Sequence, residues 1–116
     1  MKILAIVSLL VLFFSGSLAA QVKGDAAAGK IKYQMLCVSC HGATGKGDGP
    51  AATALTPKPR NFTEQAVMSK KTDADLKKVI QQGGTAAGLS PSMPPWGAAL
   101  SEQDVANVIA FIRTLK

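Results

Sequence analysis

Two cysteines and the only histidine of the chain stand together in the segment Cys37-Val38-Ser39-Cys40-His41. Two thiols three positions apart can form thioethers with neighbouring vinyl groups of one porphyrin, and an imidazole at the next position can ligate the iron. This C-x-x-C-H spacing predicts one haem c, attached covalently through Cys37 and Cys40, with His41 as an iron ligand.

Three other uses of these residues fit the sequence less well. A closed zinc site needs four ligands, so a carboxylate would have to complete the two cysteines and one histidine. A thiol redox pair usually belongs to a βαβ unit, and the chain has no convincing alternating strand. A local disulfide in an exported protein is the third alternative.

A second iron ligand would have to come from a residue other than histidine, and methionine is the usual choice. Met35 precedes the attachment cysteines too closely to reach the opposite face of a porphyrin, and we expect it in the core. Met68 lies in a segment without a clear pattern. Met93 lies in the segment Ser90-Pro91-Ser92-Met93-Pro94-Pro95-Trp96, whose prolines restrict the backbone and can hold a thioether in place. We therefore expect Met93 as the second ligand, with Met68 or an open iron site as alternatives.

The beginning of the chain has the pattern of an export signal. A charged start precedes an apolar run over residues 3–14, broken once by a serine, and a small-residue cleavage pattern follows. The run is too short to span a bilayer comfortably. We expect residues 1–19 to be a signal peptide cleaved near Ala19 and Ala20, and residues 20–116 to form a periplasmic domain without a membrane span. An uncleaved anchor is the alternative.

The charge of the chain is basic and restricts its partners. Lysine and arginine number 13 against 7 acidic residues, giving +6, and loss of Lys2 with the signal would leave +5. This balance favours redox partners with acidic docking surfaces. Nucleic acid is not an expected partner, because the cations are dispersed and no aromatic stripe accompanies them.

The length of 116 residues suits one domain, but its supply of large apolar side chains is small. After the signal the aromatic residues are Tyr33, Phe62, Trp96 and Phe111. Alanine makes up much of the remaining apolar composition. The composition therefore indicates that a bound apolar group completes the core.

Three segments have the pattern of helices, and none has the pattern of a strand. The first extends from an N-cap at Asp25 to Leu36, with Ile31 and Met35 on its expected buried face. Capping boxes begin the other two, Thr72 with Asp75 and Ser101 with Asp104. We expect the last helix to continue to the C-terminus, and two long loops, residues 42–60 and 83–97, to be shaped around a ligand. The fold class is all-α.

The order of these motifs resembles the class I cytochromes c, small monohaem carriers with His/Met ligation. Gly29 and Tyr33 match the first helix of that family, and Val108 and Phe111 resemble the opposing pair on the last helix. This resemblance implies an all-α fold in which the N- and C-terminal helices cross around one haem. It also explains a glycine within a helix, because two backbones approach closely there.

Further matches to the family lie in the loops. Gly49-Pro50 resembles the segment in which a proline carbonyl accepts a hydrogen bond from the ligating histidine. Pro59-Arg60-Asn61-Phe62 is similar to a bacterial motif, and Met93-Pro94-Pro95-Trp96-Gly97 is similar to the axial methionine loop. The resemblance implies that Pro50 orients His41, that Arg60 pairs with a haem propionate and that Trp96 packs near the porphyrin.

The resemblance implies a single-electron carrier of an exported respiratory or redox pathway, without catalytic residues. One alternative is a haem protein with an open sixth site that binds a small gas. Another is an electron-transfer subunit held tightly in a larger oxidoreductase, and a third is a thiol oxidoreductase.

Overall fold

The computed structural model describes residues 22–116. The predicted signal peptide and its cleavage site lie outside the described residues, so they stay predictions. No helix among residues 22–116 is both long and apolar enough to cross a membrane.

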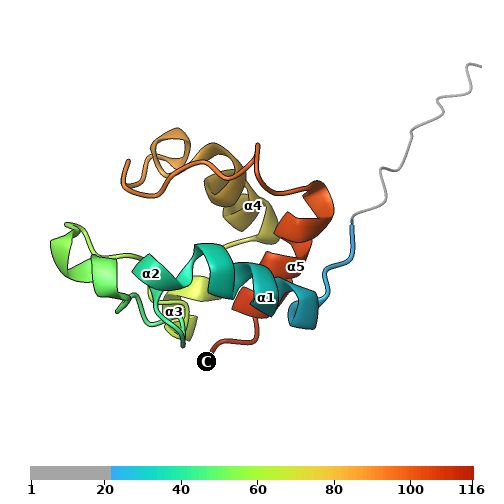
Figure 1. Ribbon diagram of the computed structural model, residues 1–116, viewed down its shortest axis with the longest axis horizontal. Coiled ribbons are helices and arrows are strands. Elements are labelled where there is room, and N and C mark those ends of the chain that lie inside the picture. Colours follow the sequence, from blue (N-terminus) through green and yellow to red (C-terminus); the bar gives the residue numbers. More distant parts are fainter. Residues whose placement is uncertain (1–21) are drawn as a thin grey trace, which may run out of the picture.

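The described part of the chain is helical and contains no strand, which confirms the all-α prediction (Figure 1). Its elements are, in order, α1 (Ala26–Leu36), α2 (Val38–His41), the 3-10 turn η1 (Pro50–Ala54), α3 (Gln65–Met68), α4 (Asp73–Gln82), the 3-10 turn η2 (Thr85–Ala87) and α5 (Glu102–Ile112). Helices α1 and α5, from opposite ends of the sequence, lie side by side.

The crossing of α1 and α5 depends on Gly29. A Cβ atom at this position would lie 1.8 Å from the carbonyl oxygen of Asn107, so no larger residue fits without separating the helices. Nearby, the backbone N–H of Asp25 donates to the side-chain oxygen of Asn107 at 2.8 Å. The close crossing expected from a glycine inside a helix is present.

The buried face of α1 differs from the one predicted. Gly29 and Tyr33 are buried, whereas Ile31 is 61% exposed and Met35 is 70% exposed. The prediction placed Ile31 and Met35 in the core because of their apolarity, and it was wrong. The physical reason is the close backbone contact at Gly29, which turns the small residue and Tyr33, one turn later, toward α5.

Side-chain caps fix the beginnings of the three main helices where the sequence places them. Asp25 accepts hydrogen bonds from the first turn of α1, and both predicted capping boxes are formed, by Thr72 with Asp75 and by Ser101 with Asp104. The last helix is shorter than predicted, because α5 ends at Ile112. These caps set the positions at which α4 and α5 enter the core.

One core cluster joins α1 to α5 and to the loops between them. Its buried members are Tyr33, Phe62, Met68, Ile80, Leu100, Val105, Val108, Ile109 and Ile112. The largest fully buried side chains are only Tyr33, Val105 and Val108. The core is therefore small, as the composition predicts.

Arg113, directly after α5, fixes the segment that joins α3 to α4. Its guanidinium donates to the carbonyl oxygens of Met68 at 2.9 Å and Lys71 at 2.5 Å, and to the Asp73 carboxylate at 3.0 Å. One side chain thus satisfies a carbonyl group at the end of α3, a second one between α3 and α4, and an acidic residue at the start of α4. This clamp fixes the point from which α4 runs toward the site described next.

Candidate functional site

An apolar pocket brings together residues from both ends of the chain and from the loops. Its open space, including the mouth, is about 330 Å³. The lining consists mainly of hydrophobic and aromatic side chains, with one imidazole and two sulfur-bearing residues: Tyr33, Cys37, His41, Phe62, Ile80, Met93, Trp96, Leu100, Val108 and Ile112. Four residues singled out in the sequence, Cys37, His41, Met93 and Trp96, therefore line one pocket.

The attachment motif is placed by the end of α1 and the short helix α2. Cys37 lies between the two helices. Its carbonyl oxygen accepts a hydrogen bond of 2.8 Å from the backbone N–H of His41. Cys37 and Cys40 are both unpaired, partly buried thiols. Burial, with a smaller effect of the neighbouring Cys40, raises the pKa of the Cys37 thiol to about 11. An unpaired cysteine pair on one helical turn is available for covalent attachment.

The imidazole of His41 is held by the backbone of a distant loop. Its Nδ1–H donates to the carbonyl oxygen of Arg60 at 3.1 Å. Since a carbonyl only accepts, the neutral ring carries its proton on Nδ1 and leaves the lone pair on Nε2 free for a metal. Burial lowers the pKa of His41, and the bond to Arg60 offsets this only in part. The ring is therefore neutral at physiological pH.

The hydrogen bond expected between Pro50 and His41 is replaced by the one to Arg60. Pro50 begins η1, and its carbonyl accepts from the hydroxyl of Thr53 at 3.5 Å. A carbonyl in the first turn of a 3-10 helix points along that helix, so it faces away from a neighbouring element. The segment around Arg60 passes His41 instead and supplies the acceptor.

Aromatic packing fixes the plane of the His41 ring. The ring of Phe62 stacks on it, with 4.5 Å between centroids and 17° between planes. Phe62 also contacts Tyr33 edge to face, at 6.4 Å between centroids. The backbone N–H of Phe62 donates to the carbonyl of Gly45 at 2.7 Å, which ties this ring to the loop after His41.

Two glycines hold the loop that follows α2 against that helix. The N–H of Gly47 donates to the carbonyl of His41 at 2.8 Å, and the N–H of Gly49 donates to the carbonyl of Cys40 at 3.1 Å. A Cβ at Gly49 would lie 2.4 Å from the carbonyl oxygens of Val38 and Ser39. The loop therefore satisfies the free carbonyls of α2, and glycine is needed for its close approach.

The loop that carries Met93 is attached to the C-terminal end of α4. The N–H of Gly84 donates to the carbonyl of Met93 at 2.9 Å, and the N–H groups of Trp96 and Gly97 donate to Ile80 and Gln81 at 2.8 and 3.1 Å. The last two bonds occupy carbonyls that the end of the helix leaves without helical partners. The position of Met93 is thus set by α4 as well as by its neighbouring prolines.

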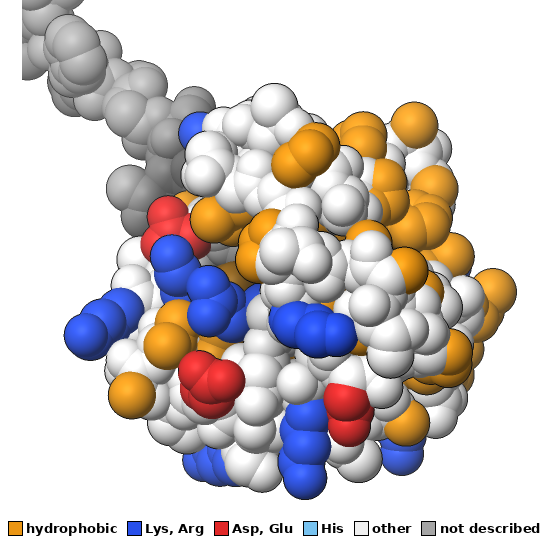
Figure 2. Space-filling view, turned by 90° about the vertical axis from the view of Figure 1, so that its left-hand side faces the viewer, with side chains coloured by type: hydrophobic (Ala, Val, Ile, Leu, Met, Phe, Trp, Pro, Cys, Tyr) orange, Lys and Arg blue, Asp and Glu red, His pale blue; other side chains and the backbone are white. Residues whose placement is uncertain are grey.

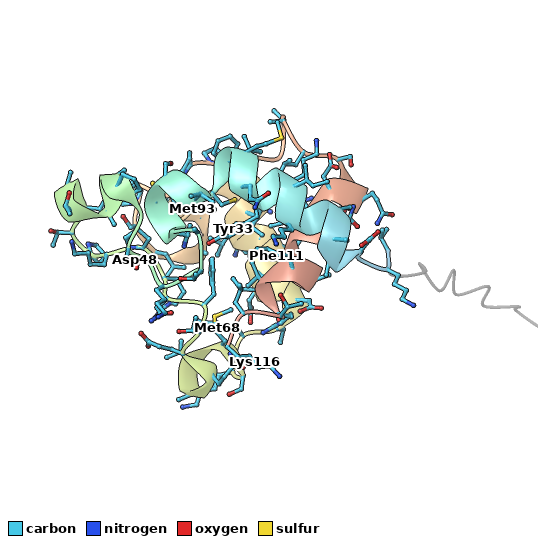
Figure 3. The ribbon with its side chains drawn as sticks, turned by 60° about the horizontal axis from the view of Figure 1, so that its bottom comes forward. Tyr33, Asp48, Met68, Met93, Phe111 and Lys116 are labelled. Atoms are coloured by element: carbon cyan, nitrogen blue, oxygen red, sulfur yellow. The ribbon has the colours of Figure 1, made fainter. Side chains whose placement is uncertain are left out.

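The three methionines considered in the sequence have different surroundings. Met93 lines the pocket, Met68 is 3% exposed within the core cluster, and Met35 is largely exposed. In Figure 3, Met93 lies close to Tyr33 of α1, whereas Met68, the last residue of α3, lies farther from both. Of these thioethers, only that of Met93 shares the pocket with His41.

The residues present fit a haem group. The pocket provides an apolar lining, the free thiol of Cys37, an imidazole with Nε2 free and a thioether on a different element. The second free thiol, that of Cys40, lies three residues after Cys37 and directly before His41. Imidazole with thioether is a donor set typical of electron-carrying haem proteins. Trp96 is partly buried and lines the same pocket, and its packing near a porphyrin stays a prediction.

Several residues of the site had no assigned role from the sequence alone. These are the hydroxyl of Tyr33, which donates to the Gly42 carbonyl, the ring of Phe62, the carbonyl of Arg60 and the backbone of Gly84. The double glycine after α4, Gly83-Gly84, is a signal visible in the sequence. A backbone acceptor such as the Arg60 carbonyl cannot be predicted from the residue type, because every residue has a carbonyl group.

Comparisons with known proteins agree with this arrangement. The family model described as Cytochrome c matches residues 26–116. Cytochrome c-554(547) of Halothiobacillus neapolitanus is 44% identical over 95 residues, which cover 80% of this chain and 99% of the relative. Cytochrome c-554(548) of Halomonas halodenitrificans is 32% identical over 88 residues, 76% of this chain and 93% of the relative.

Solved structures show the same fold. A chain of a reducing HAO-like protein complex of Kuenenia stuttgartiensis superposes with a TM-score of 0.65 and 29% identity, over 78% of this chain and 42% of that one. A c-type cytochrome, KustC0563, superposes with a TM-score of 0.60 and 22% identity, over 76% of this chain and 96% of that one.

Proposed function

We propose, from the premise that the chain belongs to the cytochrome c family, that Cys37 and Cys40 hold its haem and that His41 and Met93 ligate the iron. As a member of this family the protein is a haem c electron carrier. The observation that carries the ligand assignment is the shared pocket, which His41 and Met93 line from separate elements.

The haem supplies a one-electron change at its iron, and the protein's own residues control the surroundings. The Arg60 carbonyl and Phe62 orient the His41 ring, and Gly84 fixes the Met93 loop. The apolar lining keeps water from the metal. Because the fold holds both His41 and Met93 in place, little reorganisation of these side chains would accompany electron transfer by a bound haem.

Several finer assignments belong to the same proposal. The mature protein works in the periplasm as a carrier without catalytic residues of its own, and its positive charge steers acidic redox partners by long-range attraction. The side chain of Arg60, which is exposed, pairs with a haem propionate. Trp96 packs near the porphyrin edge.

A matched pair of methionine variants tests the ligand assignment. Met93→Ala should lower the midpoint potential, abolish the methionine–iron charge-transfer band and let the ferrous protein bind carbon monoxide. Met68→Ala should keep the spectrum and potential of the native protein and lose about 2–5 kcal/mol of unfolding free energy, because it empties a core site. An unchanged spectrum in Met93→Ala would contradict the assignment, and ready carbon monoxide binding by the native protein would favour a gas-binding function.

The covalent attachment has its own test. The alkaline pyridine haemochrome spectrum of the native protein should be that of haem c. Cys37→Ala combined with Cys40→Ala should give no folded holoprotein, because the small core cannot form without the cofactor. A stable helical double variant without haem would contradict this expectation.

A second candidate function is that of a haem subunit held in a larger oxidoreductase. The superposition on a chain of the HAO-like complex favours it, since that chain is more than twice as long as the matched part. Sedimentation of the purified protein separates the two functions. A monomer that exchanges electrons with soluble partners supports the carrier, and co-purification in a fixed ratio with an enzyme supports the subunit.

A further inference from the structure

The segment that follows α5, residues 113–116, contacts the loop that holds the His41 ring. A Cβ atom at Gly45 would lie 2.5 Å from Cδ1 of Leu115 and 3.5 Å from the Cβ atom of Phe62. The Leu115 side chain therefore packs on the backbone of Gly45, on the same side as Phe62. It is partly buried and is one of the apolar side chains that pack against the core cluster. The segment after α5 thus reaches the loop that follows α2.

Phe62 connects Gly45 to His41. Its backbone N–H donates to the Gly45 carbonyl at 2.7 Å, and its ring stacks on the imidazole with 4.5 Å between centroids. Arg60, two residues earlier, supplies the carbonyl that accepts from Nδ1 of His41 at 3.1 Å. Both groups that orient the imidazole therefore belong to one short stretch of chain, and the Gly45 contact sets the place of that stretch.

Two further contacts hold the same part of the chain to the segment after α5. The side-chain amide of Gln65 donates to the carbonyl oxygen of Leu115 at 3.0 Å. The Arg113 guanidinium donates to the carbonyl oxygen of Met68 at 2.9 Å. In Figure 3, Lys116 lies close to Met68, at the end of α3. The segment after α5 therefore fixes α3 as well as the loop before it.

We propose that Leu115 is a positioning residue of the haem site, which acts on the His41 ring through Gly45 and Phe62. This inference rests on the proposed function, because it takes His41 as an iron ligand. An imidazole ligand is oriented by the groups around it, and the loss of such a group changes the properties of the metal site. Leu115 does not line the pocket. It acts by limiting the motion of the loop that orients the ring.

The contacts of Leu115 with Gly45 and Phe62 involve no charged side chain. In Figure 2, Lys and Arg side chains are spread over the left and lower parts of one face and are interspersed with Asp and Glu. Salt screens such surface charges, whereas it leaves an apolar contact in place. The effect of Leu115 on His41 should therefore be the same at low and at high ionic strength.

The experiment measures the exchange of the Nδ1 proton of His41 with solvent, by NMR of the reduced, ¹⁵N-labelled holoprotein. This proton exchanges when the hydrogen bond to the Arg60 carbonyl opens, so the rate reports how firmly the loop holds the ring. Leu115→Ala should raise the exchange rate about tenfold, because the loop loses an apolar contact. Leu115→Met keeps the volume of the side chain and should stay within about twofold of the native rate.

Leu76→Ala is the matched control, because Leu76 of α4 is also a partly buried leucine packed against the core cluster. It should lose a similar unfolding free energy, yet keep the exchange rate of the His41 proton within about twofold of the native rate. A native rate in Leu115→Ala would overturn the proposal. Equal increases in Leu115→Ala and Leu76→Ala would also overturn it, because they would show a general loss of stability.

Gln65→Ala keeps the proposal testable if Leu115→Ala gives no holoprotein. It removes only an exposed hydrogen bond to Leu115 and should raise the exchange rate about threefold. In that case a native rate in Gln65→Ala would contradict the proposal.

A combined variant tests the path through Phe62. Phe62→Leu removes the stacked ring and should itself raise the exchange rate of the His41 proton. In that background Leu115→Ala should add less than about a twofold increase, because one residue acts through the other. A full tenfold increase in the Phe62→Leu background, as in the native one, would show that Leu115 does not act through Phe62 and would overturn the proposal.

A failure of the ligand assignment gives a different result. In the oxidised native protein, the ring protons of an iron-bound His41 have NMR resonances shifted by the unpaired electron of the iron. If these shifted resonances are missing, His41 is not a ligand and the proposed function fails. The exchange rates of the variants are measured in the reduced protein and separate the two failures.

Discussion

The hydroxyl of Tyr33 donates a hydrogen bond of 2.7 Å to the carbonyl oxygen of Gly42, the residue directly after the histidine of the attachment motif. Tyr33 is completely buried, and its ring packs on Phe111 of α5 with 5.0 Å between centroids. One side chain thus joins the helix crossing to the backbone that carries His41. Burial, followed by smaller electrostatic effects of Cys37 and Asp48, raises the pKa of Tyr33, so the hydroxyl stays a donor at any pH near neutrality.

Tyr33→Phe removes this bond and keeps the ring contacts. We expect the unfolding free energy of the holoprotein to fall by about 1–2 kcal/mol, because the Gly42 carbonyl loses its buried donor. Denaturant unfolding measures the change. Thr53→Val is the control, since it removes an exposed and longer bond to Pro50 and should cost under about 0.5 kcal/mol. If the two variants lost the same unfolding free energy, the hydrogen bond from Tyr33 to Gly42 would not contribute more to stability than an exposed one.

Gly29→Ala tests the crossing of α1 and α5. Alanine favours an isolated helix over glycine by about 1 kcal/mol, yet its Cβ would meet the Asn107 carbonyl at 1.8 Å. The obstacle is backbone, so no side-chain movement relieves it, and we expect a net loss of about 1–3 kcal/mol. Thermal unfolding checks the sign. The exposed helical substitution Gln34→Ala should be neutral or slightly stabilising, and a stabilised Gly29→Ala would show that the helices separate easily.

Gly84→Ala should displace the Met93 loop without touching the pocket itself. A Cβ there would lie 1.9 Å from the Ser90 carbonyl oxygen, and the backbone of Gly84 bonds to Met93 and Leu89. We expect a weakened methionine–iron charge-transfer band and a lower midpoint potential. Gly88→Asn is the matched control, because space around Gly88 is open and asparagine tolerates its positive φ of 69°. If both variants had the spectrum of the native protein, the backbone of Gly84 would not be what positions Met93.

Acid should weaken the cap of α5. The backbone N–H of Ser101 holds the pKa of the Asp104 carboxyl below its usual value, with smaller contributions from the Ser101 hydroxyl and Lys32. A carboxyl whose pKa is depressed in the folded state stabilises it above the unfolded pKa, near 3.8, and loses this effect as pH falls through the folded value. Asp104→Asn should therefore reduce the loss of stability below about pH 4. Unfolding of both proteins between neutral and acidic pH measures the difference, and identical slopes would contradict the role of Asp104.

The sequence by itself indicated the attachment chemistry of this protein and determined where its three main helices begin. The C-x-x-C-H spacing, the capping residues Asp25, Thr72 and Ser101, and the prolines around Met93 act locally, through the few residues on either side of them. Such effects depend on backbone geometry and side-chain type, so they can be predicted without knowledge of distant parts of the chain. The early end of α5 at Ile112 is the kind of boundary that local pattern fixes least well.

The tertiary structure alone decided which faces are buried and which backbone atoms hold the site. Ile31 and Met35 are exposed because the contact between Gly29 and Asn107 sets the rotation of α1. That contact cannot be predicted from the residue types of Ile31 and Met35. The acceptor for His41 is the carbonyl of Arg60, and that of Tyr33 is the carbonyl of Gly42. Every residue carries a carbonyl group, so only the path of the chain in space determines which one meets a given donor.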